Sequence, residues 1–143
     1  MSGSDITYRN EIPDKTGFFE LFETTGWNVD YQVDPDELYL VLKNSWHVIS
    51  AYENERLVGF GRIVSDGLLH AVIFDIIVLP RYQNRGIGKT ITLDLVEICK
   101  AHKIRDIQLF CARGKEAFYE KCGFSRRPDD GPGMEIKMKY ELL

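Results

Sequence analysis

The stretch Val78-Leu79-Pro80-Arg81-Tyr82-Gln83-Asn84-Arg85-Gly86-Ile87-Gly88-Lys89-Thr90 decides the fold of this chain. It follows the apolar run 68–79, which predicts a central strand, and it ends where apolar residues recur at helical spacing over residues 87–98. A strand therefore leads through a basic, glycine-containing turn into a helix. The free N–H groups and positive dipole end of a helix N-terminus favour anions, so the turn predicts a phosphate or pyrophosphate site.

Spacing excludes two common nucleotide loops at this turn. Gly88-Lys89-Thr90 resembles the end of a nucleoside-triphosphate loop, but the glycine required five positions before Gly88 is replaced by Gln83. The dinucleotide fingerprint matches Gly86 and Gly88 but has Ile91 in place of its third glycine. The pattern that remains is Q-x-x-G-x-G. Its structural alternative is a glycine-rich turn that binds nothing.

A second motif supports the ligand interpretation. Residues 117–124, Ala-Phe-Tyr-Glu-Lys-Cys-Gly-Phe, follow a β-like run at residues 107–111. The two motifs, in this order, resemble the acetyl-CoA pyrophosphate loop and the F-Y-x-x-x-G-F segment of the GCN5-related N-acetyltransferase (GNAT) superfamily. The resemblance covers residues 6–140 and is strongest over 73–124. It implies an enzyme with acetyl-CoA as co-substrate.

The resemblance also implies which residues bind the cofactor. The backbone of Ile76, Ile77 and Val78 would hydrogen-bond the pantetheine arm, while their side chains belong to the core. For Arg85 and Lys89 the alternative is a solvated surface charge, and Gln83 could cap the turn instead of touching the ligand. The remaining cofactor-binding residues are expected to be Asn84, Gly86, Ile87, Gly88, Thr90 and Phe118.

Two residues are candidates for catalysis. Tyr119 occupies the family position of the general acid that protonates the CoA thiolate, and a neutral tyrosine suits this role because its pKa is about 10. The alternative is an aromatic wall beside the cofactor. Asp75, a carboxylate in an apolar run, is a base, an amine anchor or a structural carboxylate paired with the backbone or an arginine. The family's frequent glutamate base is replaced by Val72 and Ile107, which makes a water-relayed proton route plausible.

The predicted reaction moves an acetyl group from acetyl-CoA to a primary amine of a small molecule or peptide, by direct attack in a ternary complex. The alternative is a non-catalytic acyl-CoA sensor or partner subunit. Many members of the superfamily carry an asparagine where this chain has Ala112, so one expected polar contact to the cofactor or the substrate is in doubt. The acceptor is undecided, and its candidate lining is Trp27, Asn28, Tyr31, Tyr39 and the loop 126–133.

Composition restricts the class of protein. A length of 143 residues predicts one domain, and 44% hydrophobic with 28% charged residues is typical of a globular protein. No apolar run approaches the roughly 20 residues of a membrane span, and the N-terminus shows no signal-peptide pattern, with residues 1–5 expected to be disordered. Cys99, Cys111 and Cys122 lack metal-site spacing and predict reduced thiols in the cytoplasm.

The net charge of −4 argues against nucleic-acid binding. No metal-ligand cluster is apparent in the sequence. A homodimer through strand edges near the C-terminus is possible, as is frequent in the superfamily.

Periodicity and turn signals give the order β-αα-βββ-α-β-α-β(β). It predicts an α/β (α+β) fold, GNAT-like, with a mixed, mostly antiparallel sheet of about six or seven strands flanked by about four helices. Asp34-Pro35-Asp36-Glu37 predicts a capped helix start. The last strand is expected at residues 134–140.

Overall fold

The computed structural model describes residues 5–138, which group into two compact units, 5–109 and 110–138. Of the residues expected to be disordered, 1–4 lie outside the described residues, and Asp5 directly precedes the first strand. The single domain stays a prediction.

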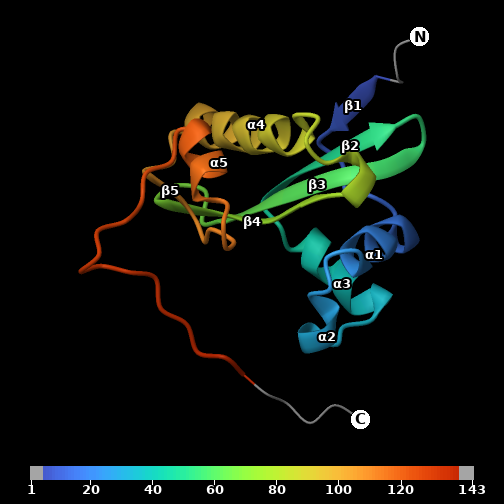
Figure 1. The fold of residues 1–143 in the computed structure, drawn as a ribbon, viewed down its shortest axis with the longest axis horizontal. Helices are drawn as coiled ribbons and strands as arrows, with labels where there is room; N and C mark the ends of the chain where they lie inside the picture. Colours follow the sequence, from blue (N-terminus) through green and yellow to red (C-terminus); the bar gives the residue numbers. More distant parts are fainter. Residues whose placement is uncertain (1–4, 139–143) are drawn as a thin grey trace. The chain divides into compact units, whose positions relative to one another are not determined.

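The first unit is built on a five-stranded sheet in the order β1-β2-β3-β4-β5 (Figure 1). Strands β1 to β4 pair antiparallel, and β5 runs parallel to β4, which confirms the mixed, mostly antiparallel sheet. The strands are β1 (Ile6–Arg9), β2 (His47–Glu53), β3 (Arg56–Ser65), β4 (His70–Val78) and β5 (Asp106–Leu109).

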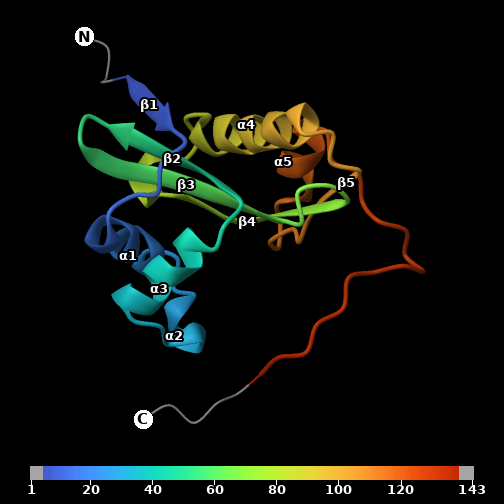
Figure 2. The ribbon, with the colours of Figure 1, turned by 180° about the vertical axis from the view of Figure 1, so that it is seen from behind.

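Helices cover both faces of this sheet (Figures 1 and 2). One face carries α1 (Lys15–Glu23), α2 (Asn28–Tyr31) and α3 (Pro35–Lys43), and the other carries α4 (Ile87–Ala101). On the α1 side, the rings of Phe18 and Phe60 pack edge to face with centroids 4.6 Å apart. On the α4 side, a Cβ at Gly61 would come within 2.7 Å of the Ile91 side chain. The glycine thus lets α4 lie close to β3.

The predicted helix start at Asp34 is confirmed. Asp34 Oδ1 accepts a hydrogen bond from the Glu37 backbone N–H (2.8 Å), and Glu37 Oε1 accepts one from the Asp34 N–H (3.0 Å). The two bonds form a complete capping box, with Pro35 at the first helical position. Helix α1 is capped by a single bond, in which the Asp14 carboxylate accepts from the Gly17 N–H.

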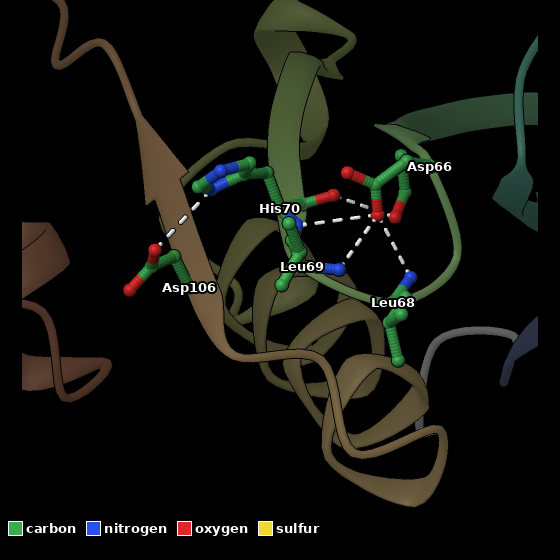
Figure 3. Close-up of polar contacts among 6 residues, drawn as sticks. Asp66, Leu68, Leu69, His70 and Asp106 are labelled. Atoms are coloured by element: carbon green, nitrogen blue, oxygen red, sulfur yellow. Dashed lines mark hydrogen bonds and ion pairs between the residues drawn. The ribbon is translucent and has the colours of Figure 1, made fainter.

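A carboxylate organises the connection between β3 and β4 (Figure 3). Asp66 Oδ1 accepts hydrogen bonds from the backbone N–H groups of Leu68, Leu69 and His70, at 2.8, 2.7 and 3.3 Å. These bonds lower the pKa of Asp66. His70 then pairs with Asp106 of β5, Nδ1 to Oδ2 at 3.2 Å, where β4 and β5 begin their ladder. The turn and this pair fix the position at which β4 starts.

The second unit contains α5 (Glu116–Lys121), which is followed by Gly123 in the left-handed region (φ 98°). The prediction of a strand at 134–140 is wrong for its described part. Residues 134–138 form no strand, and Met134, Ile136 and Met138 are 88%, 86% and 61% exposed; residues 139 and 140 lie outside the described residues. Alternation makes a segment suitable for a sheet face, but a strand also needs a partner.

The numbers of strands and helices also differ from the prediction. The described residues contain five strands rather than six or seven, and five α-helices rather than about four. The additional helix is α2, a single turn with no apolar stripe from which periodicity could predict it.

Candidate active site

The end of β4 delivers the chain into the predicted phosphate loop through a 3-10 turn, η1 (Pro80–Tyr82). The Leu79 N–H donates to the Val58 carbonyl of β3 at 2.9 Å, which anchors the start of the turn. Gln83 Nε2 donates to the Val78 carbonyl at 3.0 Å. The Gln83 side chain is therefore engaged with its own turn, in agreement with the alternative that it caps the loop.

Two left-handed residues shape the loop. Asn84 has φ 63° and Gly86 has φ 84°. A Cβ at Gly86 would meet no atom within 4 Å, so glycine is favoured there by backbone conformation, and the space beside it is open. A ligand can approach the backbone at this point.

The N-terminus of α4 lacks the cap that α1 and α3 possess. Gly86 occupies the N-cap position of this 15-residue helix, and within residues 5–138 no side chain makes a cap hydrogen bond there. The first N–H groups of α4 therefore face the loop without a protein side chain to accept from them. A phosphate oxygen is the kind of acceptor that such a terminus favours.

Positive side chains surround this terminus. Arg85 and Lys89 are exposed, and in the described part of the chain neither forms an ion pair with a carboxylate. Their charges remain available to an anion bound at the start of α4. The remaining predicted cradle residues, Ile87, Gly88 and Thr90, form the first turn of the helix.

Strand β4 changes its pairing just before the loop. Its parallel ladder with β5 ends at Ile73↔Leu109, while its ladder with β3 continues to Val78. Over Ile76, Ile77 and Val78 the backbone edge that faces away from β3 is thus not engaged in the β5 ladder. This edge is the one that the family resemblance assigns to the pantetheine arm.

Asp75 forms a bulge in β4. The β3 register passes from Arg62↔Phe74 to Phe60↔Ile77, so Gly61 alone faces Asp75 and Ile76. Asp75 has φ 57°, and its Oδ2 lies 2.6 Å from Arg62 Nε. Of the roles open to Asp75, pairing with an arginine is observed. A role in catalysis stays a prediction.

The second unit holds Tyr119 and Phe118 on α5, with ring centroids 5.0 Å apart. Tyr119 is half-buried, and burial raises the pKa of its phenol, with smaller contributions from Cys111 and Cys122. A raised pKa keeps the hydroxyl protonated near neutral pH, which a general acid requires. The loop residues and Tyr119 thus belong to different units.

Two residues of the first unit were missed by sequence reasoning. Tyr82 is buried beneath the loop, 6% exposed, and its hydroxyl donates to Glu53 Oε1 at 2.5 Å. The sequence signal that could have indicated Tyr82 was an aromatic residue between Arg81 and Arg85 in a turn.

Two of the residues considered as lining for the acceptor site lie largely at the surface. Trp27 and Tyr31 are 39% and 61% exposed, and both rings lie beside that of Phe22.

Comparison with known proteins identifies the family of this chain. The model of the acetyltransferase (GNAT) family matches residues 15–124, more than half of the chain. The chain belongs to this family. The predicted superfamily, and with it an N-acetyltransferase, is confirmed at the level of the family.

Individual relatives of this acetyltransferase agree with the family match. An uncharacterized N-acetyltransferase of Pyropia yezoensis, ycf52, is 33% identical over 119 residues, covering 80% of this chain and 67% of the relative. A Staphylococcus aureus protein described as a probable acetyltransferase has the same fold, with a TM-score of 0.79 at 24% identity over 94% of this chain and all of that one.

A third comparison concerns a ligand. The PaiA N-acetyltransferase of Thermoplasma acidophilum, solved in complex with coenzyme A, has a TM-score of 0.70 at 20% identity over 89% of this chain and 94% of that one. At this identity the comparison shows the shared fold.

The described residues were also searched for a metal site and for membrane-spanning helices. No group of three or more His, Cys, Asp or Glu side chains in residues 5–138 is placed to hold a metal ion. None of the helices described is long and apolar enough to span a bilayer. Cys99 is a buried free thiol and Cys111 an exposed one, and Cys122 is buried.

Proposed function

We propose that this acetyltransferase moves an acetyl group from acetyl-CoA to a primary amine of a small molecule or peptide. The observation that supports acetyl-CoA as the donor is the N-terminus of α4, which has no side-chain cap and follows the left-handed Gly86. Arg85 and Lys89 lie beside it and form no ion pair within residues 5–138. An anion with several phosphate oxygens satisfies such N–H groups, and the open space at Gly86 admits it.

The cofactor contacts follow from this arrangement. The α4 terminus with Arg85 and Lys89 would hold the pyrophosphate, and the edge of β4 at residues 76–78, which lies beyond the β5 ladder, would hold the amide groups of the pantetheine arm. The family resemblance, rather than the geometry, assigns Phe118 to the same cofactor. The relative solved with coenzyme A supports the choice of ligand through its shared fold.

The chemistry needs few protein groups. The acceptor nitrogen, as the neutral amine, attacks the thioester carbonyl carbon; a C–N bond forms and the C–S bond breaks. Tyr119 donates its phenolic proton to the departing thiolate, and the amine proton passes to water. No carboxylate replaces the family's glutamate at Val72 or Ile107, which favours the water route for this second proton.

Titration calorimetry against acetyl-CoA, ATP and NAD tests the donor. We expect binding of acetyl-CoA alone, and binding of ATP or NAD in its place would contradict the proposal. A panel of amines assayed for free thiol release then tests turnover. Acetyl-CoA binding with no thiol release from any amine would favour the non-catalytic sensor.

Location and assembly remain predictions. Free thiols suit a reducing compartment such as the cytoplasm. A homodimer is expected only by analogy with the superfamily, and sedimentation of the purified protein tests it.

A further inference from the structure

The phosphate loop contains a buried tyrosine, Tyr82, which lies between Arg81 and Arg85 in the sequence. Tyr82 ends η1, and its ring lies under the guanidinium groups of Arg85 and Arg81, whose Cζ atoms are 5.0 and 5.8 Å from the ring centroid. A guanidinium within about 6 Å of an aromatic ring is attracted to its face. Arg85 forms no ion pair with a carboxylate in residues 5–138, so no salt bridge there competes with this ring for its guanidinium.

The tyrosine is itself held from another element. Glu53 at the end of β2 accepts the hydrogen bond from the Tyr82 hydroxyl, and it stands opposite Ile6 of β1 and Arg56 of β3. Three paired strands therefore define the position of this carboxylate. The bond and the burial of the hydroxyl raise the pKa of Tyr82, so the phenol stays a neutral donor.

The arrangement places a negative charge close to a site that should bind an anion. A carboxylate near the phosphate loop opposes phosphate binding by Coulomb repulsion, so its presence there calls for a compensating role. Holding the Tyr82 ring in one orientation, and with it the guanidinium of Arg85, supplies that role. An arginine held in place before binding loses less side-chain entropy when the ligand arrives.

We propose that Tyr82, oriented by Glu53, is a positioning residue that holds Arg85 toward the phosphates of an acyl-CoA. The inference rests on the proposed function, because it takes the donor to be a CoA thioester. It assigns to the β2–β3 hairpin a part in cofactor affinity that the loop motif alone does not include.

The test compares two glutamates of one hairpin turn. Glu53→Ala and Glu55→Ala each remove one negative charge, but Glu55 is exposed and makes no ion pair or side-chain hydrogen bond in the part of the chain that the structure describes. Repulsion alone predicts tighter CoA binding in both variants. Positioning predicts that the Kd for CoA rises about threefold in Glu53→Ala and does not rise in Glu55→Ala. Equal Kd changes in the two variants would overturn the inference.

A double-mutant cycle shows whether Tyr82 acts through Arg85. We expect the Kd for CoA to rise about fivefold in Tyr82→Leu and in Arg85→Ala, and the double variant to bind no more weakly than Arg85→Ala alone. Additive losses would assign Tyr82 a merely structural effect and overturn the inference. Tyr82→Phe, which keeps the ring, should match Glu53→Ala and carries the test if Tyr82→Leu does not fold.

Wild-type protein separates this inference from the proposed function. If the wild type binds no CoA in the same calorimeter, the proposed function fails and the inference fails with it. If the wild type binds CoA and turns over, while Glu53→Ala and Tyr82→Phe bind it equally well, only the inference fails. A kcat within twofold of wild type, with the KM for acetyl-CoA raised, is the kinetic result expected for both variants.

Discussion

Arg62 and Asp75 face each other across a bulge in the central sheet, with Arg62 Nε 2.6 Å from Asp75 Oδ2. The two side chains are only 16% and 23% exposed, and Arg62 also reaches the Ser45 hydroxyl at 3.5 Å. Aspartate suits this position for two separate reasons. It tolerates a left-handed backbone better than most residues, and its charge neutralises a half-buried guanidinium.

Substitutions at Asp75 separate these two reasons. Asp75→Asn keeps the conformational tolerance and loses the charge, and we expect it to lower the free energy of unfolding by about 1 kcal/mol. Asp75→Ala also places a β-carbon in the left-handed region without that tolerance, which adds about 1 kcal/mol. Urea denaturation measures both. Asp75→Gly isolates the backbone: it should be more stable than Asp75→Ala, and equal midpoints would show that the bulge conformation costs nothing.

The same variants address catalysis at Asp75. If Asp75 is structural, kcat measured below the unfolding transition should stay within about a hundredfold of wild type, the size of effect that a misplacement of about 1 Å can produce. A loss of several hundredfold in Asp75→Asn with wild-type stability would instead assign it the role of a base.

Tyr119→Phe tests the general acid. Removing the hydroxyl should lower kcat at least about tenfold and leave the Kd for acetyl-CoA unchanged, because the ring stays in place. The matched control is Tyr8→Phe in β1, which removes a tyrosine hydroxyl with no assigned role. Since burial raises the pKa of Tyr119, the wild-type rate should decline only above about pH 10, and this decline should be absent in Tyr119→Phe. Unchanged turnover would remove Tyr119 from the mechanism.

Gly86→Ala tests the backbone of the phosphate loop. Gly86 and Gly26 both have positive φ, 84° and 78°, and a Cβ at either would meet no atom within 4 Å. Alanine should therefore cost each site about 1–2 kcal/mol of stability through backbone conformation alone. Only Gly86→Ala should also weaken CoA binding, since Gly26 lies between α1 and α2. Equal CoA affinities in the two variants would argue against a cofactor at this loop.

Local signals were sufficient for much of the first unit. The apolar run before Pro80 and the stripe from Ile87 predicted β4 and α4, and the Asp34 capping box predicted the start of α3 to the residue. These features depend on neighbours within one or two turns of the chain. A sequence read alone contains that information in full.

Features that depend on distant partners were not predictable. The bulge at Asp75 requires the register of β3 against β4, and an aspartate in an apolar run indicates only that something unusual occurs there. The contact of Tyr82 with Glu53 joins residues 29 positions apart. Alternation at residues 134–138 predicted a strand because it records side-chain spacing and not the presence of a partner.

The last prediction concerns pH and a cluster of rings at the start of β2. The His47 ring lies 4.6 Å from that of Trp46 and 5.4 Å from that of His102, centroid to centroid. Burial, and then the neighbouring charge of His102, lower the pKa of His47. Between its lowered pKa and the unfolded value of about 6.5, the unfolded chain binds more protons than the native one.

The free energy of unfolding should therefore decrease as the pH falls through about 6.5, until the native pKa of His47 is passed. His47→Gln should flatten this dependence, measured by urea denaturation at several pH values between 7.5 and 5. His102→Gln should flatten it only in part, because burial, the larger cause, remains. If His47→Gln retains the full wild-type slope near pH 6, the proton uptake belongs to another group and the pKa of His47 is not lowered in the folded protein.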